Sequence, residues 1–260
     1  MLVKSFTFKI ILLIILIVII SLLWYNEKSK IPFYYINLDR SVDRKERMTK
    51  LFKKYNQNCK RIPAIDGRNK QELYNILQKK PINCKQSEIE LACLCSHLKA
   101  IRQAYKEGLN EVFICEDDLI IDYYVKNRKK FNSQFSKRPS DTEIIQLFSI
   151  NNSIYDKPDD FIPWTNVHWS AVIYYINRDG MKKIVNTFFE GDKIVLPPND
   201  INRREFHTAD HLIYYPCRTY TMRFPFFNFV PKSSNIQSKQ IIDTFYPKAY
   251  NKIKEIQNPT

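Results

Sequence analysis

The stretch Val112-Phe113-Ile114-Cys115-Glu116-Asp117-Asp118 is a short apolar run that ends in three consecutive acids. A buried strand that delivers carboxylates at its C-terminal end is how an open α/β sheet builds a ligand site. Mg²⁺ and Mn²⁺ take oxygen ligands and commonly bind one or two carboxylates together with substrate phosphates. The acidic triplet therefore indicates a metal–diphosphate site, as in enzymes that use nucleotide-activated donors. The alternative is a solvated turn with surplus charge.

Helices and strands alternate on both sides of this acidic strand. Just before it, Ser87-Glu88-Ile89-Glu90 is a capping box that opens a helix, and Gly108 closes the same helix. Periodicity predicts further strands at 31–38, 141–148 and 169–176 and further helices at 41–55 and 178–189. Strands that alternate with helices predict an α/β fold built around one core.

Composition removes several classes of protein. Only four glycines occur in 260 residues, which excludes the glycine-rich phosphate loops of dinucleotide-binding and P-loop proteins. The formal net charge of +14 favours an acidic partner, but the lysines are dispersed, so no nucleic acid is expected as a partner. The six cysteines lack zinc-finger spacing, so no structural zinc site is expected.

The N-terminal residues suggest a membrane anchor. Ile10 to Tyr25 form an uncharged run, mostly Ile and Leu, which Phe6, Phe8 and Lys9 extend toward the roughly 20 residues that span a bilayer. No small-x-small cleavage site follows, which favours an uncleaved signal-anchor over a signal peptide. We therefore expect an anchor at 1–30, a main domain at 31–231 and a basic, partly loose tail at 232–260. The main domain of this single-pass membrane protein is expected outside the cytosol, in the ER or Golgi lumen if the source is eukaryotic.

Polar side chains gather where the first predicted strand ends. Asn37, Asp39 and Arg40 follow that strand, and Arg44 lies one helical turn further on. Guanidinium groups at such a place suit bidentate contacts to a diphosphate. Plain surface charge is the alternative explanation for both arginines.

Two further positions carry candidate chemistry. His97 lies on the helix that the capping-box acid Glu90 opens, where a lone histidine is more often a core group than a ligand. Asp210-His211 follows a proline-bearing loop, and such a pair can supply a general base and a metal ligand together. A helix-capping aspartate beside a surface histidine is the alternative.

Five motifs, in order, resemble glycosyltransferase family 25, which includes lipooligosaccharide and procollagen galactosyltransferases. They are Tyr35-Ile36-Asn37-Leu38-Asp39-Arg40 with Asp43-Arg44 and Arg47-Met48, Ala64-Ile65-Asp66-Gly67, Glu90-Leu91-Ala92-Cys93-Leu94-Cys95-Ser96-His97, Glu116-Asp117-Asp118, and Asp210-His211. The resemblance spans about Ile31 to Tyr215. It implies a GT-A-like nucleotide-sugar-binding domain, with a mixed sheet flanked by helices. It also implies Mn²⁺ or Mg²⁺ and inverting transfer of a hexose, galactose or glucose, from a UDP-sugar to a glycan, lipid or protein hydroxyl.

The resemblance assigns roles to these residues. Glu116 and Asp118 would hold the metal with His211 as a third ligand, and Asp210 would take the proton from the acceptor hydroxyl. The residues expected to bind the nucleotide sugar are Asn37, Asp39, Arg40, Arg44, Asp66, Glu90, His97 and Asp117.

The chain departs from the family pattern at three places. Trp169-Ser170 replaces a usual Gly-Thr, Ala92 replaces a glycine, and Thr208 or Ala209 replaces a proline. These departures leave the identities of donor and acceptor open. A catalytically inactive carbohydrate-binding or scaffold protein therefore stays the alternative.

Overall fold

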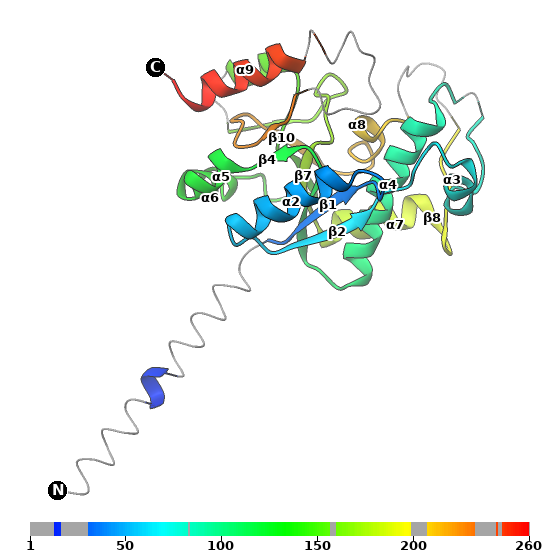
Figure 1. Ribbon diagram of the computed structural model, residues 1–260, viewed down its shortest axis with the longest axis horizontal. Coiled ribbons are helices and arrows are strands. Elements are labelled where there is room, and N and C mark those ends of the chain that lie inside the picture. The colour runs from blue at the N-terminus through cyan, green and yellow to red at the C-terminus, as the bar shows by residue number, and fades with distance from the viewer. Residues whose placement is uncertain are drawn as a thin grey trace, which may run out of the picture.

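The acidic strand lies inside a mixed sheet, in a computed structural model that describes residues 13–16, 31–82, 84–156, 160–198, 207–231, 243 and 246–259 (Figure 1). Within these residues the main sheet has seven strands in the order β2-β1-β3-β7-β5-β10-β6. Its strands are β1 (Phe33–Asn37), β2 (Cys59–Pro63), β3 (Glu111–Glu116), β5 (Ile144–Gln146), β6 (Phe161–Pro163), β7 (Ile173–Asn177) and β10 (Thr219–Met222). Two short strand pairs, β4 (Leu119–Ile120) with β11 (Asn228–Phe229) and β8 (Phe189–Glu190) with β9 (Lys193–Ile194), lie beside it.

Strand direction brings distant segments to one edge of the main sheet. Strand β1 pairs in parallel with β2 and β3, whereas β7 runs antiparallel to β3 and β5. The C-terminal ends of β1, β3 and β5 therefore meet the start of β7. At this edge the main-chain N–H of Glu116 donates to the Val172 carbonyl at 2.9 Å.

Helices cover both faces of the sheet, because successive strand residues point to opposite sides. Val112 and Ile114 of β3 join one buried cluster, and Phe113 and Cys115 join the other. The helices are α2 (Val42–Lys54), α3 (Lys70–Ile76), α4 (Glu88–Lys106), α5 (Asp122–Lys126), α6 (Arg128–Phe135), α7 (Arg178–Phe188), α8 (Ala209–Leu212) and α9 (Tyr246–Gln257), with a 3₁₀ turn η1 (Asn152–Asp156). Helices α4 and α7 pack on the first face, and α2, α6 and α9 pack on the second. The predicted α/β class and the mixed sheet flanked by helices are confirmed.

Helix α4 begins and ends where the sequence predicts. The Ser87 hydroxyl oxygen accepts from the Glu90 N–H at 3.3 Å, and the Glu90 carboxylate accepts from the Ser87 N–H at 2.8 Å. Gly108 follows the helix with φ +76, the left-handed conformation that glycine adopts most readily. The capping box and the glycine stop are thus both confirmed.

The strand predicted at 169–176 begins only at Ile173, because the preceding residues form a constrained loop. Ser170 has φ +136, which L-residues rarely adopt and which does not continue a strand. Its carbonyl accepts hydrogen bonds from Gln146 Nε2 at 2.9 Å and from the Tyr214 hydroxyl at 2.8 Å, both of them buried. This loop is therefore held in place at the sheet edge where the strands converge.

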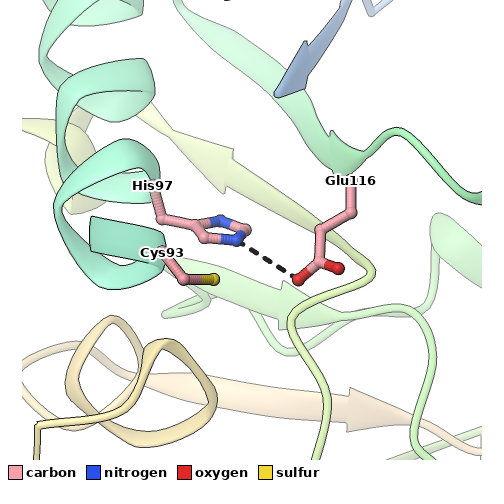
Figure 2. A group of neighbouring side chains, drawn as sticks. All are labelled: Cys93, His97 and Glu116. Carbon is pink, nitrogen blue, oxygen red and sulfur yellow. Dashed lines mark ion pairs between the residues drawn. The ribbon is translucent and has the colours of Figure 1, made fainter. Parts of the chain in front are cut away.

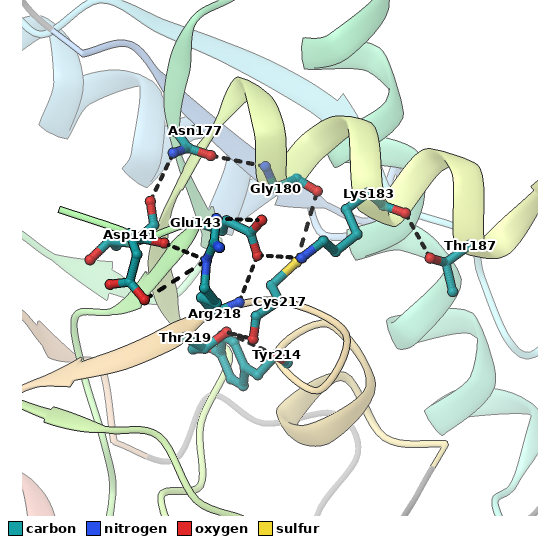
Figure 3. A network of polar contacts seen from close by, with 11 residues as sticks. Asp141, Glu143, Asn177, Gly180, Lys183, Thr187, Tyr214, Cys217, Arg218 and Thr219 are labelled. Carbon is teal, nitrogen blue, oxygen red and sulfur yellow. Dashed lines mark hydrogen bonds and ion pairs between the residues drawn. The ribbon is translucent and has the colours of Figure 1, made fainter. Parts of the chain in front are cut away.

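At the opposite ends of these strands, the buried carboxylate of Glu143 links neighbouring elements. Figure 3 shows it between Lys183 of α7, whose ammonium lies 2.7 Å away, and the main-chain N–H of Arg218, which donates at 2.7 Å. Asn177 caps α7 by accepting from the Gly180 N–H at 2.9 Å. These contacts join β5, β10 and α7 far from the acidic triplet.

The C-terminal segment contains a packed helix. We predicted a partly loose tail from Lys232, yet Ala249 and Ile253 of α9 are buried, and the Tyr246 ring lies 5.3 Å from that of Phe229. Apolar residues at helical spacing, which a reading of the tail by its charge passes over, explain the difference. In Figure 1 α9 is the red helix beside the C-terminus.

The expectation of a single-pass membrane location is corrected. In the part of the chain that the structure describes, no helix has both the length and the apolar character needed to cross a bilayer. Most of the expected anchor, apart from 13–16, lies outside the described residues.

Candidate functional site

A cleft of about 980 Å³ opens at the edge where β1, β3 and β7 converge. It is bounded by the ends of these strands, the first half of α4 and the start of α8. The predicted site residues that line it are Asn37, Arg40, Arg44, Asp66, Glu90, His97, Glu116, Asp117, Asp118 and Asp210. Asp39 and His211 are not among the described residues that line this cleft.

The middle acid of the triplet is held by α2 and β1. Asp117 accepts from Asn37 Nδ2 at 2.5 Å and pairs with Arg44 Nη1 at 2.8 Å. Arg47 donates to its main-chain oxygen at 2.7 Å. Burial raises the pKa of the Asp117 carboxyl, while Arg44 and Asn37 oppose that rise. Asp117 thus fixes the end of β3 against α2, and its carboxylate oxygens already have partners.

Glu116 points to the other face of the sheet, as the strand alternation requires. Its Oε1 lies 3.5 Å from Nε2 of His97 on α4 (Figure 2). Burial and the neighbouring Asp117 charge raise the pKa of Glu116 to about 7, against the effect of Arg44. Asp118 is buried at the cleft wall, and its main-chain oxygen accepts from the Val230 N–H at 2.8 Å. Glu116 and Asp118 both line the cleft, on either side of Asp117 in the sequence.

Arg40 and Arg44 of the first motif are each paired with an acid. Arg40 Nε lies 2.6 Å from Asp66 Oδ2, and both side chains line the cleft. Asp39 instead turns outward and pairs with Arg61 of β2, which also donates to Asn37 Oδ1 at 2.8 Å. Arg61 is not among the residues predicted from the sequence, because its contact with Asn37 depends on the parallel pairing of β1 with β2.

Besides Glu90, helix α4 contributes the polar side chains of Cys93, Ser96 and His97 to the cleft. The Ser96 hydroxyl accepts from the Ile65 N–H at 2.9 Å, which ties the Ala64–Gly67 motif to the helix. His97 is fully buried, and burial lowers its pKa to about 4, so its imidazole is neutral at physiological pH. Cys93 also lines the cleft. Cys93 is not among the residues predicted from the sequence, although its spacing of four from His97 places both on one helix face.

The predicted Asp210-His211 pair is divided by the fold. Asp210 lines the cleft. Its negative charge raises the pKa of His97, which burial lowers, and also raises the pKa of Cys93, which burial raises too. Asp210 therefore lies near both side chains. His211 turns away: its Nε2 lies 2.9 Å from the Asn166 carbonyl and its Nδ1 lies 3.1 Å from the Thr208 hydroxyl. Adjacent helical residues point about 100° apart, so one helix turn does not direct both side chains into one cleft.

Buried histidines should make the stability of the protein sensitive to acid. Burial and the Arg223 charge lower the pKa of His168, whose Nδ1 accepts from the Thr165 N–H at 3.3 Å. The unfolded chain, with the ordinary pKa of 6.5, then binds the proton first, so this contribution to stability is lost as the pH falls below about 6.5. We expect His168→Asn to reduce the pH slope of the unfolding free energy by up to about 1.4 kcal/mol per pH unit. Urea unfolding between about pH 7 and 5 measures it, and equal slopes would contradict the prediction.

Comparisons with known proteins agree on one class. The family model described as glycosyltransferase family 25 (LPS biosynthesis protein) matches residues 30–196, which include the acidic triplet but not Asp210. Lacto-N-neotetraose biosynthesis glycosyltransferase LgtE of Neisseria meningitidis serogroup B is 28% identical over 117 residues, covering 39% of this chain and 40% of that protein. The chain thus spans less than half the length of this curated relative.

Two solved structures are distantly similar. One is the crystal structure of a glycosyltransferase involved in glycosylation of the major capsid of PBCV-1, with 11% identity and a TM-score of 0.34 over 75% of this chain and 94% of that one. The other is mouse xyloside xylosyltransferase 1 in its apo form, with 10% identity and a TM-score of 0.29 over 58% of this chain and 55% of that one.

Proposed function

This chain belongs to glycosyltransferase family 25, and from that premise we propose that it transfers a hexose, galactose or glucose, from a UDP-sugar to a hydroxyl of a glycan, lipid or protein. The observation that carries the proposal is the convergence of Glu116, Asp118 and Asp210 in one cleft. A GT-A-like arrangement of donor and acceptor on opposite cleft walls is part of the same proposal.

The donor diphosphate is proposed to lie beside the ends of β1 and β3. Glu116 and Asp118 offer carboxylate oxygens, the donor type that Mn²⁺ and Mg²⁺ prefer, so the residues present fit such a cation. When bound, the cation would offset the negative charge of the leaving diphosphate. Arg40 lines the same wall and is the guanidinium placed to contact phosphate or uridine, held by its pair with Asp66.

Asp210 is proposed to act as the general base. The acceptor oxygen would attack C1 of the donor sugar as the bond from C1 to the diphosphate oxygen breaks, and the Asp210 carboxylate would take the hydroxyl proton. A single displacement from the opposite face inverts the configuration at C1. Asp210 suits this role because it lines the same cleft as Glu116 and Asp118 but comes from a separate element, α8.

Release of UDP tests this function. The full chain would be incubated with UDP-glucose, UDP-galactose and their N-acetyl forms, with Mn²⁺ or with a chelator. The name of the relative LgtE makes oligosaccharides related to lacto-N-neotetraose the first acceptors to screen. We expect metal-dependent UDP release with a hexose donor. No turnover with any donor and acceptor would instead support a catalytically inactive carbohydrate-binding protein.

Trp169 is expected to contribute to acceptor binding. Its side chain lines the cleft yet is 44% exposed, so the indole offers a flat apolar face to a sugar ring. Trp169→Ala should raise the KM for the acceptor by about 10-fold, equivalent to about 1.4 kcal/mol, with little change in the KM for the donor. Trp169→Phe, which keeps a ring, should have a smaller effect. A rise in donor KM alone would show that the ring serves the other substrate.

A further inference from the structure

Three side chains of different chemistry converge inside the cleft. Cys93 and His97 come from one face of α4, and Glu116 comes from the end of β3 (Figure 2). The Cys93 sulfur, an imidazole nitrogen of His97 and a Glu116 carboxylate oxygen all lie within 4.8 Å of one another. A thiol, an imidazole and a carboxylate together form a donor set that Asp117 and Asp118 do not provide.

His97 is aimed into this cluster by the residue behind it. Its Nδ1 lies 3.2 Å from the Tyr174 hydroxyl, which can accept a hydrogen bond from Nδ1–H. That contact fixes the ring and leaves Nε2 facing Cys93 and Glu116. Nε2 is buried and has no hydrogen-bond partner among the described residues, because Glu116 at 3.5 Å is too distant for a good hydrogen bond. A buried imidazole with one nitrogen held and the other directed at acid and thiol is the usual arrangement of a metal ligand.

We propose that Cys93, His97 and Glu116 bind a divalent cation of the Zn²⁺ type, with a fourth coordination position open to the cleft. Glu116 Oε1, which faces His97, would be the carboxylate ligand, and Oε2 would remain for the cation proposed beside Asp118. Sulfur and imidazole donors select Zn²⁺ over Mg²⁺ or Ca²⁺, which prefer oxygen. Tetrahedral Zn²⁺ sites place neighbouring ligand atoms roughly 3.3–3.8 Å apart. Side-chain rotations that move the three ligand atoms by about 1 Å would therefore bring them to this spacing. On binding, the Cys93 S–H bond breaks, the thiolate coordinates the metal, and the proton passes to the buffer.

A nucleophilic thiol is the competing explanation, and the geometry opposes it. In a cysteine–histidine–acid triad the thiol and the acid contact opposite nitrogens of the imidazole. Here both face the same side of His97, and Tyr174 occupies the other nitrogen. Burial also raises the pKa of the Cys93 thiol well above its usual range, which disfavours a reactive thiolate in the metal-free protein.

Direct metal binding tests the proposal without reference to sugar transfer. The chelator-treated full chain would be titrated with Zn²⁺ against a chromophoric competitor, and with Co²⁺ as a spectroscopic probe. We expect one tight equivalent of Zn²⁺, and a Co²⁺ complex with thiolate-to-metal charge-transfer absorption. Cys93→Ser and His97→Gln should each weaken Zn²⁺ binding by about 100-fold or more.

The matched control is Cys59→Ser, which removes a half-buried thiol at the start of β2, at the opposite end of the sheet from the cleft. It should leave the affinity unchanged. Unaltered affinity in both cluster variants, or a wild-type Co²⁺ spectrum without the thiolate band, would overturn the proposal. The spectrum decides the matter even if a variant does not fold. A protein that binds Zn²⁺ but transfers no sugar would contradict the proposed function and leave this site standing.

Discussion

Asp118→Ala is expected to lower the rate of sugar transfer by about 10³-fold, equivalent to about 4 kcal/mol of transition-state stabilisation. Asp118 is proposed to be one of two carboxylates that hold the cation beside the leaving diphosphate, since Asp117 is already held by Asn37 and Arg44. Removing it leaves a single acid for the metal. The loss should appear in kcat and in the Mn²⁺ concentration needed for half-maximal rate.

The matched control for Asp118→Ala is Asp179→Ala. Asp179 is an exposed acid in the first turn of α7, outside the cleft, and its loss should change the rate by less than about twofold. Initial rates of UDP release over a series of Mn²⁺ concentrations provide the comparison. Should Asp118→Ala retain the wild-type rate and Mn²⁺ dependence, the proposed cation site would be wrong, whatever the family membership.

Gly67→Ala is expected to destabilise the protein by about 3 kcal/mol, at the upper end of the usual range for overpacking. A Cβ at Gly67 would lie 2.5 Å from the Ile89 Cα, 2.6 Å from the Glu88 carbonyl oxygen and 2.8 Å from the Ile89 nitrogen. All three are main-chain atoms of α4, so no side-chain rotation relieves the clash. The start of α4 and the Ala64–Gly67 motif must therefore move apart, which displaces Asp66 relative to α4.

Gly191→Ala is the control for this substitution, because Gly191 has φ +56 but nothing within 4 Å of an added Cβ. It should cost only about 1 kcal/mol, the ordinary penalty for a left-handed residue. Urea unfolding of both variants measures the difference. Equal losses of stability would show that the contact between Gly67 and α4 is not as close as described. We also expect Gly67→Ala to reduce sugar transfer even in the folded fraction.

Local rules predicted the elements that depend on neighbouring residues. The capping box at Ser87–Glu90, the stop at Gly108 and the acidic strand are each specified within a few positions of the chain. The cleft also follows from a general rule, because the C-terminal ends of parallel strands meet at one edge. Asn37 and Glu116, at the ends of two such strands, both line the cleft.

The directions in which the site side chains point depend on tertiary contacts, which the local sequence does not specify. Nothing within the triplet itself distinguishes Asp117, which α2 holds, from Glu116, which faces α4; strand alternation and the identity of the covering helices do. His211 was grouped with Asp210 by adjacency, yet it lies against the Asn166 carbonyl. Cysteine spacing rules do not predict the Cys93–His97–Glu116 cluster, because Glu116 comes from a strand and lies 19 residues after His97.

The reversed direction of β7 brings separate stretches of chain to one cleft. Residues up to Asp118 supply the acidic triplet and Arg40, while the loop with Trp169 and the turn with Asp210 come from later in the chain. On the proposed function, a few substitutions in that loop exchange one acceptor for another and leave donor chemistry intact. Acceptor choice in this chain would then change through a single short segment, without alteration of the residues proposed to hold the donor.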